Sequence, residues 1–511
     1  MRYAVGIDVS TTSVKAVLVD ETGAIRGVAT KAHGISCPQP LWSEQDPADW
    51  WDGVRETLQT LVSESGIGPE HILSVGLTGQ MHGLVLLDKE GQILRPAVLW
   101  NDQRTGAECD QIRDRIGRDR LLATTGNDAV TGLTLPKLLW VANHEPDVYK
   151  RIAQVLLPKD YVRYRLTGDY ATDKAGAAGT LMMDLATRDW SPEILDAFSI
   201  PKTWLPDTFE GPVATGVVSE EGARATGLAP GTRVVAGAGD QAAQAVGVGA
   251  VRTRDVAVTI GTSGVVFCST DRPRVDPEGR LQAFCHAIPD QWHLMGVMLS
   301  AAGSLRWLRD VAAPDVEFGA LADASADVPP GASGLLFLPY LSGERMPYAD
   351  PLMRGGFVGL TTRHTRAHLT RSVLEGVSFG LRDGLELLRG LCTSSIEEVR
   401  VSGGGAKSDL WRQILADILG VRVARVTSEE GAAHGAALLA GVGGGFWSSV
   451  EDACSAATSI EDLVSPIEEN VACYDRLYAL YRDSYPSCRS LAHRLSEYEQ
   501  EVLQCRRAPQ A

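Results

Sequence analysis

The chain has 511 residues, of which 44% are hydrophobic and 22% are charged. A chain of this length exceeds what one hydrophobic core supports, so we expect two large domains. The formal net charge of −16 argues against nucleic acid or an anionic membrane surface as the main partner.

No apolar run approaches the ~20 residues that a membrane-spanning helix requires. The first residues lead directly into an apolar strand, without the basic segment, apolar core and cleavage site of a signal peptide. Nine cysteines are dispersed between Cys37 and Cys505 with no Cys-x-x-Cys pair, a pattern typical of reduced thiols. The sequence therefore predicts a cytoplasmic protein without a zinc or disulfide framework.

The first informative stretch runs from Val5 to Val17: an apolar strand, a turn of small hydroxyl residues and a second apolar strand. Asp8 ends the first strand, and the polar residues that follow it are Thr11, Thr12, Ser13 and Lys15. A carboxylate beside hydroxyls, N–H groups and a cation suits a nucleotide phosphate with its Mg²⁺. A hairpin whose hydroxyls only cap its turn has the same pattern, so this stretch alone leaves both interpretations open.

Strands and helices then alternate through the first half of the chain. We expect a helix from Pro47 to Ser63 with Asp46 as its N-cap, strands from Ile72 to Leu77 and from Leu84 to Leu87, an apolar strand that begins at Ala97, and a helix that opens at Pro158. The segment from Gly211 to Gly231 is rich in turn residues, which favours a β-layer insertion.

A strand that begins at Val234 ends in glycines and the carboxylate of Asp240, and a helix of small residues follows from Gln241 to Val246. The glycines leave Asp240 without side-chain cover, so it is the strongest candidate for a general base. Asp240 would also serve as the N-cap of the following helix, and the two roles are compatible.

The opening pattern returns about 250 residues later, from Val256 to Phe267, with Thr262 and Ser263 in the turn. Two similar hairpins, each at the start of one half, suggest duplicated domains with a cleft between them. We place these domains at residues 1–250 and 251–511.

The second half offers a possible nucleotide platform, a strand, Gly-Gly-Gly and helix from Val401 to Leu410, with Ser408 as the cap. Glycines let a ligand approach the backbone, and a helix N-terminus favours anions. There is neither a P-loop motif nor the catalytic-loop pattern of protein kinases. Other predicted helices run from Arg366 to Arg389, with Gly376, Gly380 and Gly384 on one side, from Glu429 to Ala440 after Ser428, and near Val471 to Tyr481, before a frayed polar tail beyond about Glu499.

Eight short motifs occur in a fixed order: Gly6–Ser13, Gly79–Gly83, Leu99–Arg104, Leu157–Tyr161, Gly237–Asp240, Ile260–Gly264, Phe337–Arg345 and Ser402–Ala406. Together they resemble the FGGY carbohydrate kinases over roughly residues 3 to 440. The resemblance implies an α/β fold of two actin-like (ribonuclease-H-like) domains with a central ATP/sugar cleft. It implies ATP and Mg²⁺ as cofactors and a small-molecule sugar as the partner, and Met81-His82-Gly83 points within the family to D-xylulose.

The resemblance also implies roles for individual residues. Asp240 would accept the proton of the C5 hydroxyl, and Asp8 would orient Mg²⁺. The implied sugar contacts are Met81, His82, Trp100, Asp240 and Gln241; the implied phosphate contacts are Thr11, Thr12, Ser13, Lys15, Thr262 and Ser263; and Gly303, Gly404 and Ser408 would lie at the adenosine. Related enzymes often have Asn where this chain has Gln241, whose side chain is one methylene longer.

Two other functions stay open at this point. One is a sister kinase for another ketose or polyol, such as ribulose, gluconate or erythritol. The other is an actin-like nucleotide-binding scaffold without sugar chemistry, against which Asp240 and the Met81-His82 pair argue. The sequence leaves the oligomeric state open, with a homodimer as one candidate.

Overall fold

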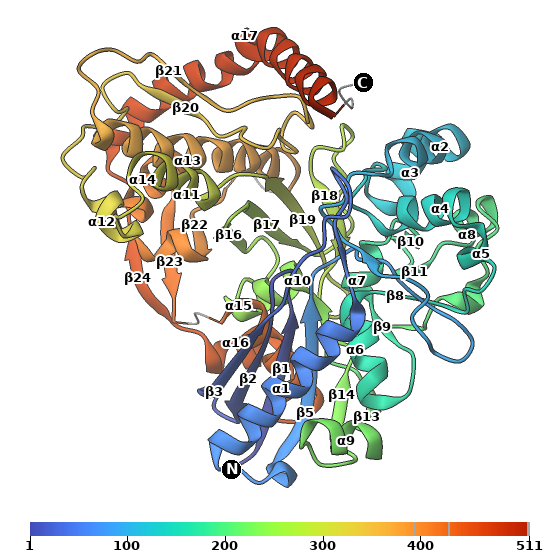
Figure 1. Ribbon diagram of the computed structural model, residues 1–511. Helices are drawn as coiled ribbons and strands as arrows, with labels where there is room; N and C mark the ends of the chain where they lie inside the picture. The colour runs from blue at the N-terminus through green and yellow to red at the C-terminus, as the bar shows by residue number, and fades with distance from the viewer. Residues whose placement is uncertain (393–394, 428–429, 508–511) are drawn as a thin grey trace. The chain divides into compact units, whose positions relative to one another are not determined.

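The computed structural model describes residues 1–392, 395–427 and 430–507, which form two compact units (Figure 1). The first unit joins Met1–Thr253, Ser269–Leu294 and Glu430–Ser459. The second joins Arg254–Cys268, Met295–Glu429 and Ile460–Ala511. Among the described residues, no helix combines the length and the apolar character that a bilayer crossing demands.

The first unit is built on a sheet with the strand order β13-β14-β5-β1-β2-β3. Its strands are β1 (Tyr3–Val9), β2 (Ser13–Asp20), β3 (Ile25–Ala32), β5 (Ile72–Gly79), β13 (Ala214–Val217) and β14 (Arg233–Val235), and β15 (Ala238–Gly239) also pairs with β5. β1 runs antiparallel to β2 and parallel to β5. The predicted strand-turn-strand at the start of the chain is therefore confirmed.

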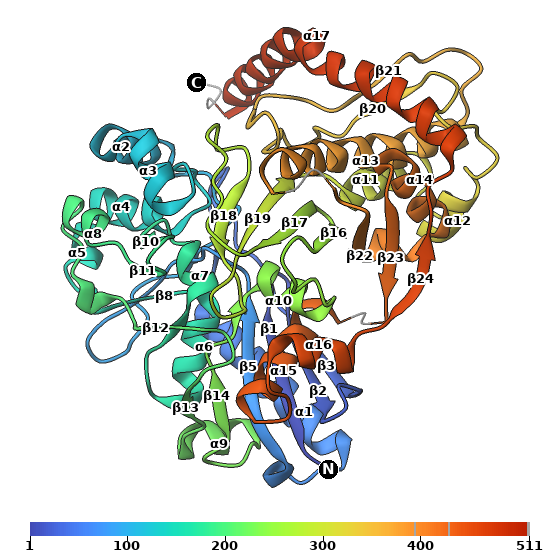
Figure 2. The ribbon, with the colours of Figure 1, turned by 180° about the vertical axis from the view of Figure 1, so that it is seen from behind.

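Side chains of this sheet alternate between two apolar layers because successive residues of a strand point to opposite faces. α1 (Pro47–Ser65) contributes Trp50 and Val54 to the layer that holds Ile7, and Asp46 caps this helix as predicted (Figure 1). α15 (Gly431–Gly443) covers the other face (Figure 2). The expected start of this helix at Ser428 and Glu429 lies outside the described residues.

Glycine lets α15 approach the backbone of the sheet closely. A Cβ added at Gly6 of β1 would lie 2.0 Å from the carbonyl oxygen of Ala433, and one at Gly76 of β5 would lie 2.1 Å from that of Ala436. Any larger side chain at either position would push the helix away. The helix–sheet contact therefore requires glycine on both central strands.

The first unit also contains elements outside this sheet. They are β4 (Glu44–Gln45), β6 (Val85–Leu87), β7 (Ala97–Val98), α2 (Gly106–Ile116), α3 (Arg118–Thr125), α4 (Thr134–His144), α5 (Pro146–Tyr149), β8 (Gln154–Leu156), α6 (Pro158–Thr167), β9 (Thr172–Asp173), α7 (Lys174–Ala178), β10 (Met183–Asp184), β11 (Asp189–Trp190), α8 (Pro192–Ala197), β12 (Thr208–Phe209), α9 (Glu220–Thr226), α10 (Asp240–Gly247), β18 (Gln282–Cys285) and α16 (Val450–Ala457), with short 3₁₀ turns at Pro69–His71 and Lys202–Trp204.

The second unit repeats the strand pairing of the first. Neighbouring strands follow the order β17-β16-β22-β23-β24, with bounds β16 (Val256–Ile260), β17 (Gly264–Thr270), β22 (Glu398–Ser402), β23 (Arg422–Val426) and β24 (Ile460–Val464). β16 is antiparallel to β17 and parallel to β22, as β1 is to β2 and β5. The duplication predicted from the two hairpins is thus present in the strand pairing as well.

Helix α13 (Arg366–Leu391) fills the core of the second unit, and its three glycines mark close contacts with strands and loops. A Cβ at Gly376 would lie 2.3 Å from the carbonyl oxygen of Phe337 in β20 (Leu336–Leu338), and one at Gly384 would lie 2.3 Å from Val266 of β17. At Gly380 the neighbour is Met298 of β19 (Trp292–Met298). The other elements are α11 (Ala302–Ala312), α12 (Phe318–Asp323), β21 (Gly356–Val358), the 3₁₀ turn η3 (Gly404–Lys407), α14 (Asp409–Leu419) and α17 (Glu468–Arg507).

Several predicted elements differ from the structure. The strand expected from Ala97 is only the two-residue β7, and the expected β insertion after Gly211 also contains helix α9. The strand from Val234 is interrupted at Gly237, whose φ of +77° breaks it into β14 and β15. Because a positive φ interrupts an extended backbone, a glycine inside a strand pattern predicts such a break.

The largest difference is the last helix. α17 extends over 40 residues to Arg507, far beyond the predicted Val471–Tyr481, so the segment after Glu499 is helical where a frayed tail was predicted. Its first half is fixed to α13 by phenol groups: the Tyr474 hydroxyl lies 2.8 Å from a Glu375 oxygen, and Tyr478 donates to Asp383 at 2.7 Å. Buried tyrosines at helical spacing continue this contact, but Pro486 lies inside α17, and a proline within a helical pattern predicts an earlier end of the helix.

Candidate functional site

The end of β5 brings together two carboxylates from neighbouring strands. Asp8 of β1 lies opposite Thr78 of β5, and on the other side of β5 the short strand β15 ends at Gly239, opposite Gly79. Asp240 follows directly as the first residue of α10, and Gly239 is the N-cap of that helix. The N-cap position considered for Asp240 is therefore occupied by Gly239.

Burial and mutual repulsion disturb the titration of both groups. Burial raises the pKa of Asp240 to about 7, and the adjacent negative charge of Asp8 adds to the rise. Hydrogen bonds from the backbone and side chain of Gln241 act in the opposite direction on the pKa of Asp240. Burial likewise raises the pKa of Asp8 to about 6, against the attraction of Lys15. Two carboxylates with raised pKa values at a strand end are typical of a functional site.

The neighbours of Asp8 show which of its atoms a ligand could use. Lys15 lies opposite Asp8 in the β1–β2 register, and its ammonium is 2.7 Å from a carboxylate oxygen of Glu430. Asp8 Oδ1 is buried and has no hydrogen-bond partner among the residues that the structure describes. A buried carboxylate oxygen without a donor is unfavourable, so this atom fits a site for a cation or its bound water.

Met81 and His82 lie in the loop after β5, both buried. His82 adopts a left-handed backbone, with φ of 67°, and its Nδ1 is 2.7 Å from the carbonyl oxygen of Gly179. A Cβ added at Gly239 would lie 2.9 Å from Met81, so Met81 packs directly beside the residue that precedes Asp240. The structure therefore brings Met81 and Asp240 to one place.

The turn of the first hairpin is tied to this loop through buried amides. Trp100 Nε1 donates to the Thr11 hydroxyl at 3.0 Å, and Gln45 Nε2 donates to the Thr11 carbonyl at 2.8 Å. Gln80 in turn donates to Gln45 Oε1 at 2.9 Å. Gln45 and Gln80 are absent from the predicted site, although both immediately adjoin predicted elements. Of the remaining turn residues, Thr12 is exposed and the Ser13 hydroxyl lies 3.2 Å from that of Ser10.

In the second unit, the turn of the repeated hairpin lies against the N-terminus of α11. The carbonyl of Thr262 accepts hydrogen bonds from the N–H groups of Ala301 at 2.9 Å and Gly303 at 3.1 Å. A Cβ at Gly303 would lie 2.9 Å from that same carbonyl oxygen, so the close approach requires glycine. Thr262 is exposed and Ser263 is half-buried, which leaves both hydroxyls accessible to a ligand.

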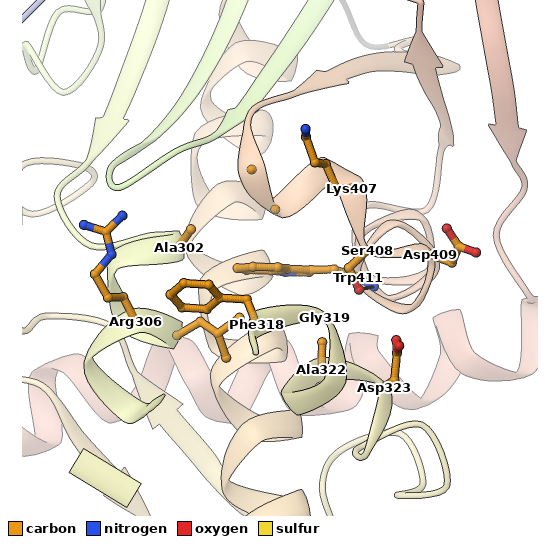
Figure 3. A pocket seen from close by; sticks show the side chains of 13 residues that line it. Ala302, Arg306, Phe318, Gly319, Ala322, Asp323, Lys407, Ser408, Asp409 and Trp411 are labelled. Atoms are coloured by element: carbon orange, nitrogen blue, oxygen red, sulfur yellow. Dashed lines mark hydrogen bonds between the residues drawn. The ribbon is translucent and has the colours of Figure 1, made fainter. Parts of the chain in front are cut away.

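A pocket of about 550 Å³ lies beside this turn in the second unit (Figure 3). It is lined by Ala302, Leu305, Arg306, Phe318, Gly319, Ala322, Asp323, Gly404, Gly405, Lys407, Ser408, Asp409 and Trp411. The close view shows the ring of Trp411 beside that of Phe318, with Arg306 at one end and Asp409 at the other. Ser408 caps α14 by accepting from the N–H of Trp411 at 3.3 Å, as predicted. Aromatic walls with a few polar groups suit a nucleoside.

Comparison with known proteins shows which family models and relatives match the chain. The model of the FGGY N-terminal domain matches residues 3–247, and that of the FGGY C-terminal domain matches residues 256–444. The chain is 43% identical to xylulose kinase of Escherichia coli K12, over 85% of this chain and 89% of the relative. It is 38% identical to xylulose kinase of Bacillus subtilis 168, over 98% and 99% of the two chains.

A solved structure shares the fold. The crystal structure of xylulose kinase from Rhodospirillum rubrum superposes with a TM-score of 0.88 at 33% identity, covering 96% of this chain and 100% of that one. A gluconokinase of Bacillus subtilis 168 is a more distant relative, at 29% identity over 98% of this chain and 99% of the relative. The expected α/β fold of two actin-like domains is confirmed. The chain belongs to the FGGY family of carbohydrate kinases.

Proposed function

We propose that this carbohydrate kinase transfers the terminal phosphoryl group of ATP to the C5 hydroxyl of D-xylulose. The observation that carries the proposal is the Asp240 carboxylate, which has a raised pKa and follows the residue against which Met81 packs. The high identity to two xylulose kinases over most of both chains supports D-xylulose as the substrate. The gluconokinase relative is less similar, so gluconate is the second candidate.

In this mechanism Asp240 is the general base. A carboxylate with a pKa of about 7 can take a proton and release it again near neutral pH. Asp240 accepts the proton of the sugar hydroxyl while the hydroxyl oxygen bonds to the γ-phosphorus and the bond from phosphorus to the β-phosphate oxygen breaks. The products are the sugar phosphate, ADP and a proton on Asp240. Because phosphoryl transfer requires alignment more than covalent catalysis, the other residues position the reactants.

The sugar contacts in this proposal are Met81, His82, Trp100 and Gln241. The hydrogen bond from Gln241 to Asp240 gives this glutamine a second task, because it holds the base carboxylate while its pKa is raised by burial. Related enzymes often have Asn at this position. The side chain of Gln241 is longer, but it too has an amide beside the base. Trp100 would approach the sugar from the side of the hairpin turn, since its indole N–H donates to Thr11.

Asp8 is the residue that would hold Mg²⁺, directly or through a water molecule. Its buried Oδ1 fits an oxygen-preferring cation. The described residues contain no group of three or more His, Cys, Asp or Glu side chains that could enclose a metal. A site with the single carboxylate of Asp8 agrees with Mg²⁺, which keeps several waters and binds mainly through substrate phosphates. When bound, the ion would neutralise charge on the phosphates.

We assign the nucleotide to the second unit, where the pocket beside α14 would take the adenosine. Gly404 and Ser408 line this pocket, and Gly303 holds the neighbouring hairpin turn. Thr262 and Ser263 present hydroxyls and N–H groups for the phosphates. In the first unit, Thr11, Thr12, Ser13 and Lys15 keep the same assignment as predicted phosphate contacts. A cytoplasmic location and a homodimer stay predictions, which cell fractionation and light scattering would test.

The deciding measurement is ADP release with and without D-xylulose. We expect sugar-dependent release, with D-xylulose giving the highest kcat/KM in a panel that also holds ribulose, gluconate and erythritol. Asp240→Asn should lower that rate by about 10²–10⁴-fold and leave ATP binding unchanged. Asp119→Asn, at an exposed position of α3, is the matched control and should be unaffected. Near-normal turnover by Asp240→Asn would refute the base, and a better sugar would refute the substrate.

A further inference from the structure

The backbone of His82 is held in an unfavourable conformation by two side chains from one helix. A φ of 67° lies in the left-handed region, which is uncommon outside glycine, although histidine, like Asn and Asp, adopts it more often than other residues do. The carbonyl oxygen of His82 accepts hydrogen bonds from Lys137 Nζ at 2.9 Å and from the Thr134 hydroxyl at 3.0 Å. Both donors come from the first turn of α4. Strain at such a residue persists only where its surroundings enforce it.

Lys137 is an unusual residue at this position. Its side chain is fully buried, and its ammonium also donates to the carbonyl of Gly132 at 2.7 Å. Burial of an ammonium is unfavourable, and a cation in the first turn of a helix opposes the helix dipole. Neither the stability of α4 nor solvation therefore explains why a lysine occupies this position. What it does provide is a charged donor aimed at the backbone of His82.

The imidazole of His82 is held by a separate contact, with Gly179 at the end of α7. A carbonyl oxygen can only accept a hydrogen bond, so the contact of 2.7 Å with Gly179 requires a proton on Nδ1, which defines the tautomer of the ring in its neutral form. In this tautomer Nε2 is an acceptor. A Cβ at Gly179 would lie 2.7 Å from Nδ1 and 3.0 Å from Met81, so the ring and Met81 pack on the end of α7 with no spare space. The ring orientation follows from these contacts.

We propose that Lys137 is a positioning residue for the sugar: it holds the backbone of His82 so that Nε2 of the imidazole accepts a hydrogen bond from a sugar hydroxyl. Thr134 assists through the same carbonyl. Lys137 itself touches no reacting atom. This inference rests on the proposed function, because it assumes that the sugar binds beside Met81 and His82.

The test is a double-mutant cycle read in the KM for D-xylulose. Lys137→Met keeps the unbranched apolar part of the side chain and removes the ammonium, and it should raise that KM about tenfold, the effect of losing one charged hydrogen bond. The KM for ATP should change by less than about twofold. In a His82→Ala background the same substitution should add little, because no imidazole is left to position. Thr134→Val should behave in the same way with a smaller increase, and it replaces Lys137→Met in the cycle if that variant does not fold.

Leu139→Ala is the matched control, because Leu139 is a buried residue of the same helix. It should lower thermal stability and leave the KM for D-xylulose unchanged. An unchanged KM in both Lys137→Met and Thr134→Val would overturn the proposal, as would an equal increase in the His82→Ala background or a parallel rise in the KM for ATP. Failure of the proposed function would appear differently, as an absence of D-xylulose-dependent ADP release by the unmodified protein.

Discussion

At the scale of residues, the pair Asp8 and Asp240 shows that two carboxylates close together at strand ends lower the stability of the folded state. Each carboxylate is half-buried at the end of a strand beside β5, and each has a raised pKa. When both are ionised they repel each other, so the folded state is less stable with the two charges than without them. The site is therefore maintained by the stability of the surrounding sheet and helices.

Burial of the Asp240 carboxylate, reinforced by this repulsion, predicts a pH-dependent gain in stability for Asp240→Asn. The pKa of Asp240 is raised from 3.8 to about 7, so below pH 3.8 the residue is neutral in both folded and unfolded chains and the substitution changes little. As pH rises towards 7, the unfolded carboxylate ionises first and the native protein loses stability, an effect on the order of a few kcal/mol that Asn abolishes. We expect the melting temperature of Asp240→Asn to exceed that of the unmodified protein by more at pH 8 than at pH 5.5. A difference in melting temperature that is constant or that decreases as the pH rises would contradict the raised pKa of Asp240.

Some of these residues could be recognised in the sequence and others could not. Asp8, Asp240, Thr262 and Ser408 each follow or precede a strand or helix with a clear pattern, so their local position is readable from the chain. Lys137 lies 55 residues from the carbonyl that it contacts, and it resembles an ordinary helix residue. A contact between segments far apart in the sequence leaves no local pattern, and Gln45 and Gln80, which are 35 residues apart, were missed for the same reason.

At the scale of elements, long periodic segments were predicted best. The hairpins, α1, α13 and α14 agree with their expected positions because burial on one face produces a period that tertiary contacts reinforce. The short strand β7 pairs with β4 at two positions, and α17 continues through Pro486, so neither has the extent that its local pattern predicts. The glycines of α13 oppose its helix propensity, and their purpose is visible only once the neighbouring strands are known.

Two glycines of α13 allow a matched prediction. At Gly376 an added Cβ would lie 2.3 Å from a backbone oxygen, whereas at Gly390, in the same helix, it meets no described atom within 4 Å. Gly376→Ala should therefore destabilise the protein by roughly 1–3 kcal/mol through overpacking. Gly390→Ala should stabilise it by up to about 1 kcal/mol through helix propensity. Thermal or urea unfolding measures both, and a change of the same sign in the two variants would refute the close contact at Gly376.

At the scale of the molecule, the repeated strand pairing was predictable from the two hairpins, but the route of the chain was not. After β23, the chain returns to the first unit, where Glu430–Ser459 supplies α15 and α16. Nothing in the sequence of α15 indicates which sheet it covers, because alanine and glycine suit any close helix–sheet contact. The match between Gly6 of β1 and Ala433 becomes evident only from the backbone distance.

This route predicts that the first half of the chain does not fold by itself. A fragment of residues 1–250 lacks α15, so one apolar face of its sheet, including Val17 and Val19, would be exposed to water. We expect the fragment to be insoluble or to unfold without cooperativity, whereas addition of residues 430–459 through a flexible linker should restore a cooperative melting transition. A fragment of residues 1–250 that melts cooperatively and stays monomeric would contradict the need for α15.

Because α15 lies late in the sequence, it is synthesised long after the sheet that it covers. Its last residue, Gly443, is translated 364 residues after the end of β5 at Gly79. At the usual rate of ~5–20 residues per second, the face of the sheet that α15 covers waits about 20–70 s on the ribosome for its helix. During that wait Val17 and Val19 of this face are exposed to water, and only at its centre do Gly6 and Gly76 present little apolar surface. The late synthesis of α15 thus exposes the nascent chain to the same association that we expect of the fragment of residues 1–250.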